Sequence, residues 1–144
     1  MTKRKAGPGA DLFHARLSGQ DLSGTDLHGA NMALANLKDC KMAEARLGGA
    51  FLFAANLSGA DLSGADLSNA DLSEADLFGA NLAGANLHGA DLRRANLSVT
   101  NLRGARLSDS NLRDTILKGA DMTDAQLDGA DLTGAVLDED EASA

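Results

Sequence analysis

The chain has 144 residues, of which 44% are hydrophobic, and it carries a formal net charge of −8 at pH 7. No apolar run approaches the about 20 residues that a transmembrane helix needs, so we expect no membrane span. The single cysteine, Cys40, excludes an internal disulfide, and its place in the repeat described below predicts a buried thiol that packs as a small apolar side chain.

The two ends of the chain differ in charge from the part between them. Lys3, Arg4 and Lys5 give a basic start, but no apolar segment follows them, so we expect a cytoplasmic protein without a secretory signal. Residues 1–9 are predicted to form a disordered basic tail. Residues 138–144 contain four acidic residues and are predicted to form an acidic C-terminal tail.

Residues 10–137 repeat a five-residue unit, A-(D/N)-L-x-x, 26 times without an insertion or a deletion. Its centre is leucine 23 times and methionine three times. Five residues turn a helix by about 500°, so successive leucines would lie about 140° apart and form no stripe. An odd period also places successive leucines on opposite faces of a straight strand. The chain must therefore turn between units if all leucines face one interior.

The last position of the unit indicates where the chain turns. Thirteen units end in glycine and five in Asp or Asn, residues that accept a positive φ, so a type II turn is predicted there. Six other units end in residues for which a positive φ is unfavourable, and we expect a different turn type at them. These are Leu34, Glu44, Ala54, Glu74, Arg94 and Val99.

This uninterrupted repeat resembles the pentapeptide-repeat proteins throughout residues 10–137. The resemblance implies an all-β solenoid, a right-handed quadrilateral β-helix with four pentapeptides per coil and about six and a half coils. Charge supports a coil of twenty residues independently. Arg46 lies twenty residues from both Asp26 and Asp66, so stacking at that period places opposite charges next to each other.

One side of this solenoid departs from the repeat by carrying large apolar residues. Phe51 stands where the repeat has Asp or Asn, and Phe53 stands where it has Ser or Thr. Leu34 and Phe13 fall on the same side, one and two coils toward the N-terminus. Exposed apolar clusters of this kind often mark association surfaces, so the four residues are a candidate partner or dimer patch. The alternative is that the rings only cover alanines at the corner.

A second apolar pair, Ile116 and Val136, lies on another side near the C-terminal end. The last coil of a solenoid exposes strand edges that another chain can pair with. Two rods that meet end to end would cover this pair. Alternatively, the acidic residues that follow Leu137 blunt the edge by repulsion.

Five arginines between residues 91 and 113 form a candidate charged contact band. The pentapeptide-repeat proteins that this chain resembles include a branch that binds type II topoisomerases and imitates duplex DNA, so the resemblance implies DNA mimicry as one possible function. DNA as long as the rod, about 31 Å, would carry roughly 18 charges, whereas the repeat has ten basic and seventeen acidic residues, a net charge of −7. The arginines interrupt this acidity, and without interleaved aromatics they do not indicate nucleic-acid binding. They are Arg93, Arg94, Arg103, Arg106 and Arg113.

No catalytic or metal-binding pattern is present. His28 and His88 share a column but lie three coils apart, about 14 Å, which is too far to share a metal. We therefore expect no enzyme, no metal and no cofactor. The sequence predicts a non-catalytic protein-binding or scaffold rod whose partner is another protein or a second copy of the chain. The alternatives are a DNA-mimicking modulator of gyrase and a structural rod without a specific partner.

Overall fold

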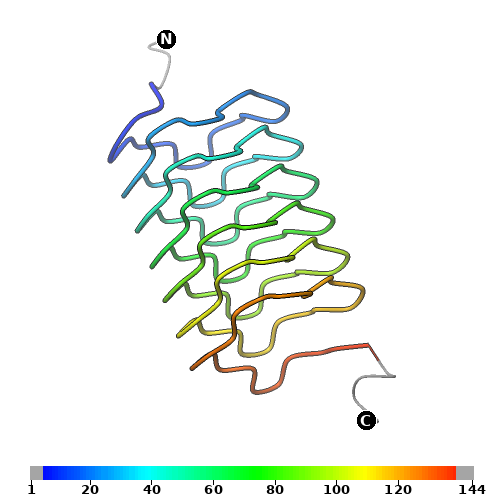
Figure 1. Cartoon of the computed structure of the whole chain (residues 1–144). Coiled ribbons are helices and arrows are strands. Elements are labelled where there is room, and N and C mark those ends of the chain that lie inside the picture. The colour runs from blue at the N-terminus through cyan, green and yellow to red at the C-terminus, as the bar shows by residue number, and fades with distance from the viewer. Residues whose placement is uncertain (1–4, 139–144) are drawn as a thin grey trace.

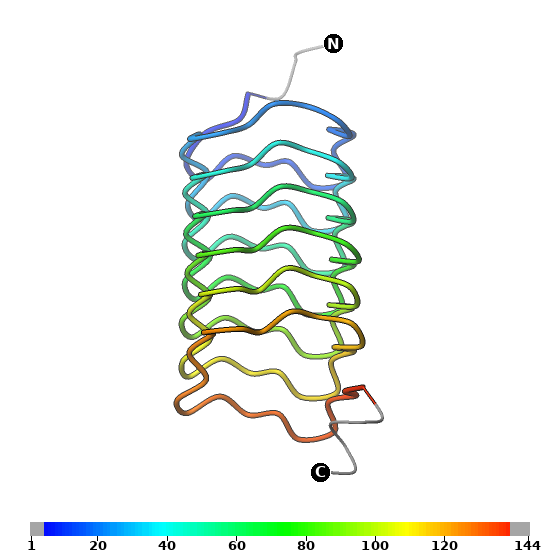
Figure 2. The same ribbon diagram turned by 45° about the vertical axis from the view of Figure 1, so that its right-hand side comes forward.

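The computed structural model describes residues 5–138, which wind into a solenoid of stacked coils (Figures 1 and 2). These residues contain no helix and no continuous strand, and hence no helix able to cross a membrane. Their β structure consists of 22 isolated parallel bridges that join residues twenty positions apart, from Asp11–Asn31 to Ile116–Val136. Each coil therefore takes four repeats. The total of six and a half coils stays a prediction.

Most of the two predicted tails, residues 1–4 and 139–144, lies outside the described residues. The coil geometry begins before Ala10. The N–H of Gly9 donates to the carbonyl of His28 at 2.9 Å, and the N–H of Ala10 closes a turn on the carbonyl of Gly7 at 3.1 Å.

The four sides of the solenoid are numbered here by the repeats of one coil. Side 1 contains residues 11–14 and the equivalent residues at every further twenty positions, so it includes 31–34, 51–54, 71–74, 91–94, 111–114 and 131–134. Sides 2, 3 and 4 begin in the same way with residues 16–19, 21–24 and 26–29.

The preference for Asp or Asn before each leucine follows from backbone hydrogen bonding. In a typical repeat, the N–H groups of Asp71, Leu72 and Glu74 donate to carbonyls of neighbouring coils at 2.7–2.9 Å, and the N–H of Ala75 closes the corner on the carbonyl of Leu72 at 3.0 Å. The one remaining N–H, that of Ser73, donates to the side-chain oxygen of Asp71 at 3.0 Å. An Asp or Asn therefore satisfies the donor that the neighbouring coils do not reach.

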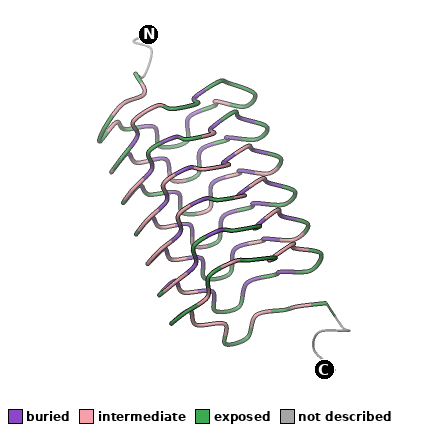
Figure 3. Cartoon of the chain, viewed as in Figure 1, coloured by how far each residue is buried: buried purple, intermediate pink, exposed green. Residues whose placement is uncertain are grey.

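The core is a column of leucine and alanine side chains along the inside of the solenoid. Figure 3 marks the buried residues of each coil in purple. Cys40 is buried in it as predicted, and burial raises the pKa of its thiol. The inward hydroxyls of Thr100, Ser110 and Thr115 each donate to the carbonyl three residues earlier at 2.7–2.9 Å, so no buried polar side-chain atom lacks a partner in the described chain. The last coil is open, because its interior side chains, Leu132 among them, are only partly buried.

The corners do not follow the prediction made from their side chains. All six residues for which a different turn type was expected have a positive φ, between 54° and 61°, like the Asp and Asn residues at other corners. The prediction was wrong because the register of hydrogen bonds between coils fixes the backbone conformation of the corner residue. The N–H of Val99, for example, must reach the carbonyl of Lys118 at 2.8 Å. Each such residue carries a strain of order 1 kcal/mol that glycine avoids.

Glycine at these strained corners is expected to stabilise the protein. Ala54→Gly and Val99→Gly should each raise the free energy of unfolding by about 1 kcal/mol, with Val99 giving the larger gain because it is β-branched. Urea unfolding followed by circular dichroism measures the change. The reverse substitution, Gly84→Ala, is the control. Its new Cβ would contact nothing within 4 Å, but its φ is +66°, so stability should fall. Unchanged stability in all three variants would show that the corner residues with a side chain carry no backbone strain.

Candidate protein-binding surface

Side 1 gathers the four residues of the predicted apolar patch. Phe51 bridges to Asn31 of the preceding coil, and the N–H of Leu34 donates to the carbonyl of Phe53 at 2.9 Å, so the patch spans consecutive coils. Phe13, Phe51 and Phe53 are 40–53% exposed, and Leu34 is 39% exposed. Exposed clusters of large apolar residues often mark binding surfaces.

The five arginines predicted as one band lie on three different sides. Arg93, Arg94 and Arg113 belong to side 1, where they continue the apolar patch toward the C-terminus. Arg103 lies on side 3 and pairs with a carboxylate of the next coil at 3.3 Å, and Arg106 lies on side 4. Neighbours in the sequence are thus separated by the corners between them.

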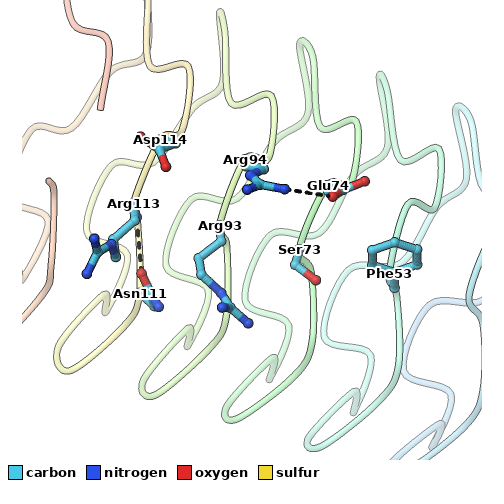
Figure 4. A pocket seen from close by; sticks show the side chains of 8 residues that line it. All are labelled: Phe53, Ser73, Glu74, Arg93, Arg94, Asn111, Arg113 and Asp114. Carbon is cyan, nitrogen blue, oxygen red and sulfur yellow. Dashed lines mark hydrogen bonds and ion pairs between the residues drawn. The ribbon is translucent and has the colours of Figure 1, made fainter. Parts of the chain in front are cut away.

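A hollow of about 500 Å³ on side 1 joins the apolar patch to these arginines (Figure 4). It forms because the short side chain of Ser73 lies between two long ones, Phe53 and Arg93, in successive coils. The residues that line it are Phe53, Ser73, Glu74, Arg93, Arg94, Asn111, Arg113 and Asp114.

The arginines of the hollow differ in how fully they are paired. Nε and Nη2 of Arg93 donate to both carboxylate oxygens of Asp91, with the shortest contact at 2.7 Å. These hydrogen bonds lower the pKa of Asp91 and raise that of Arg93. Arg94 and Arg113 each make one longer ion pair, at 3.5 Å with Glu74 and at 3.6 Å with a carboxylate of the last coil. Both retain donors that a partner can use.

The corner that follows side 1 lacks glycine over six consecutive coils. At the other three corners, glycine fills four or five of the described positions. At this corner, side chains stand at a φ of 54–61° instead. The residues are His14, Leu34, Ala54, Glu74, Arg94 and Asp114. Backbone strain is therefore concentrated along the edge that carries the patch and the hollow.

Side 2 carries a further group of exposed apolar residues, two of which the sequence analysis missed. Phe78 and Val99 are 50% and 57% exposed, and the predicted pair Ile116 and Val136, which bridge to each other, are 40% and 44% exposed. With the side 1 patch they account for every exposed large apolar residue of the described chain. Sides 1 and 2 share a corner, so the apolar residues occupy adjoining surfaces and leave sides 3 and 4 polar.

Near the C-terminal end of the rod, one corner of side 2 is hydrogen-bonded differently from the equivalent corners before it. The N–H of Gly119 donates to the side-chain carboxylate of Asp138 at 3.0 Å, whereas its equivalents donate to a backbone carbonyl. Association through Ile116 and Val136 stays a prediction. Between residues 5 and 138 no group of three or more His, Cys, Asp or Glu residues is placed to hold a metal ion.

Comparison with known proteins gives a family and a fold. A family model described as pentapeptide repeats matches residues 10–49, 55–94, 70–109 and 100–138, in eight copies. A search of curated proteins found no significant match.

Among solved structures, a pentapeptide repeat protein from the thylakoid lumen of Arabidopsis thaliana is 36% identical, with a TM-score of 0.57 over 72% of this chain and 69% of that one. The pentapeptide repeat protein Rfr23 from the cyanobacterium Cyanothece 51142 is 33% identical, with a TM-score of 0.53 over 82% of this chain and 91% of that one. QnrB1, a plasmid-mediated fluoroquinolone resistance protein, is 20% identical, with a TM-score of 0.45 over 89% of this chain and 92% of that one, and no functional conclusion follows from that match.

Proposed function

We propose that this chain, which belongs to the pentapeptide repeat family, is a non-catalytic scaffold that binds another protein. The fold of that family is the right-handed quadrilateral β-helix. The binding surface is side 1 with the adjoining part of side 2. The partner covers the apolar patch and extends over the hollow toward Arg113.

The observation that carries this proposal is the corner that lacks glycine over six consecutive coils. Four of its residues destabilise the rod by roughly 1 kcal/mol each, and nothing in the backbone register requires a side chain there, because glycine serves at the other corners. They are Leu34, Ala54, Glu74 and Arg94. Side chains retained at such a cost are explained by contacts that they make with a partner. The same edge carries the exposed patch.

Phe51 adds an independent argument of the same kind. An aspartate at this position would accept a hydrogen bond from the N–H of Phe53, as Asp71 does from Ser73 in the next coil. Phenylalanine gives up that acceptor, at a cost of about 1 kcal/mol, and exposes 53% of its own surface. A purely structural rod gains nothing from this exchange, which disfavours the alternative of a rod without a partner.

The DNA-mimicking alternative is less well supported by the charges. Arg93, Arg103 and Arg113 pair with aspartates on sides 1 and 3 at 2.7–3.6 Å. These pairs neutralise carboxylates that would have to stand in for phosphates. A modulator of gyrase therefore remains the second hypothesis for the function.

The test replaces the patch with the repeat's own consensus. Phe51→Asp with Phe53→Ser gives this coil the sequence of the next one, Asp71-Leu72-Ser73, so the variant should fold at least as stably as the parent. We expect it to lose at least about thirtyfold in affinity for a partner that is first identified by cross-linked capture from the native cells. Calorimetry with the purified partner measures the loss.

The matched control makes the same local sequence on the opposite side. Asn81→Asp with Ala83→Ser, on side 3, should bind the partner like the parent chain. Equal affinity of both double variants would show that side 1 is not the binding surface. Sedimentation of the protein alone distinguishes a second copy from a different partner.

A further inference from the structure

The hollow at Ser73, called the slot below, lies between a phenyl ring and a guanidinium group. Phe53 and Arg93 belong to coils on either side of Ser73, two strand spacings apart, which is about 9.6 Å. Figure 4 shows the small side chain of Ser73 between the ring and the guanidinium group. A ring above Ser73 would be one coil, about 4.8 Å of backbone spacing, from each of the two groups, within reach of edge-to-face aromatic and cation–π contacts.

The two polar side chains closest to the slot, those of Ser73 and Arg93, already have hydrogen-bond partners, which limits the chemistry of the occupant. The hydroxyl of Ser73 donates to Asp71 at 2.6 Å, so it does not direct a donor into the slot. The guanidinium of Arg93 is held by two contacts with Asp91, which use one edge and fix its plane. What remains for a ligand is the exposed surface of the Phe53 ring on one side of Ser73 and the guanidinium group of Arg93 on the other.

We infer that this slot holds an aromatic side chain of the bound protein, with carboxylates of the same segment on Arg94 and, farther toward the C-terminus, on Arg113. The inference rests on the proposed function and names the chemistry of the partner. The aromatic ring presents its negative face to Arg93, which is the electrostatic complement of a guanidinium. Arg94 and Arg113 make only single contacts of 3.5 and 3.6 Å and are 71% and 53% exposed, so their free donors suit a carboxylate beside the ring.

The size of the hollow agrees with this occupant. Its volume of about 500 Å³ accommodates a ring together with neighbouring atoms of the segment, and it lies within the roughly 300–1,000 Å³ of typical binding sites. Aromatic anchors in such pockets dominate many protein interfaces.

The experiment titrates three acetylated tetrapeptide amides into the ¹⁵N-labelled protein and follows amide chemical shifts. The sequences are Glu-Phe-Glu-Glu, Glu-Ala-Glu-Glu and Gln-Phe-Gln-Gln. We expect the first peptide to shift the signals of Phe53, Ser73 and Arg93 saturably. It should bind about tenfold more tightly than the peptide without the ring, and severalfold more tightly than the peptide without carboxylates. Equal affinities, or shifts elsewhere on the rod, would overturn the inference.

Filling the slot provides the matched variants. Ser73→Phe should abolish binding of the first peptide, whereas Ser63→Phe, at the equivalent position of side 3, should leave it unchanged. Both serines donate to the aspartate two residues earlier, at 2.6 and 2.7 Å, so the two substitutions disturb the same local contacts. Arg93→Gln, which removes the cation but keeps a polar side chain, should weaken binding about threefold to fivefold. This variant tests the inference even if Ser73→Phe does not fold.

The outcomes separate this inference from the proposed function. If Ser73→Phe leaves the affinity of the captured partner unchanged while Phe51→Asp with Phe53→Ser reduces it, the binding function stands and the slot does not hold an anchor. If the peptides bind but no partner depends on side 1, the slot chemistry stands and the proposed function fails. A dimer in sedimentation that dissociates in Ser73→Phe would assign the slot to a second copy and overturn the inference.

Discussion

Leu72→Ala is expected to lower the free energy of unfolding by about 3–4 kcal/mol, because the leucine is completely buried in the middle of the rod. The same substitution in the last coil, Leu132→Ala, should cost only about 1–2 kcal/mol, since that side chain is partly exposed and the cavity opens to solvent. Urea unfolding of the two variants beside the parent chain measures both losses.

The comparison also tests whether the C-terminal end of the core is open in solution. Equal losses for the two leucines would mean that the last coil is covered, by a second copy or by another part of the chain. Because neighbouring coils contribute most of each other's stability in a solenoid, the unfolding curves should be analysed for loss of cooperativity as well as for the midpoint.

Exchanging two neighbouring residues should have an even larger effect. Ala105 is completely buried and Arg106 is exposed, so the double change Ala105→Arg with Arg106→Ala keeps the composition and charge but moves a guanidinium into the core. We expect a loss of at least about 4 kcal/mol, because no carboxylate is buried in the described core to pair with it. Thermal unfolding by circular dichroism measures the loss.

The control for this exchange is Arg106→Ala alone. It removes the same exposed side chain without burying a charge, and stability should change by no more than about 0.5 kcal/mol. A double variant that unfolds like the single one would show that residues two positions before the central leucine do not face inward.

The interior of the rod was predictable because one feature of the repeat determines it. With alanine and leucine two positions apart and the period constant, only a coil that turns after each unit buries all the leucines. The corner conformation was not predictable from Leu34 or Val99 themselves. There the neighbouring coils impose a positive φ through backbone hydrogen bonds, and this tertiary constraint overrides the preference of the side chain.

Parts of the binding surface could have been found by writing the sequence in rows of twenty residues. That arrangement places Phe78 and Val99 in the side that also holds Ile116, and it separates Arg103 from Arg93. It also reveals one corner column that lacks glycine over six consecutive coils. The slot could not have been found in this way. It depends on the fixed guanidinium of Arg93, which is an outcome of side-chain geometry.

The uniform backbone register has a consequence for how such a surface can change. The distance between the apolar patch and the arginines is a whole number of strand spacings, so it can lengthen or shorten only in steps of about 4.8 Å, by gain or loss of twenty residues. Such a step leaves every corner and every core contact of the remaining coils intact. The spacing between binding groups on the rod is therefore set by the number of coils between them. Duplication of a twenty-residue coil can adjust this spacing to a partner whose anchor residues are farther apart, without any change to the fold.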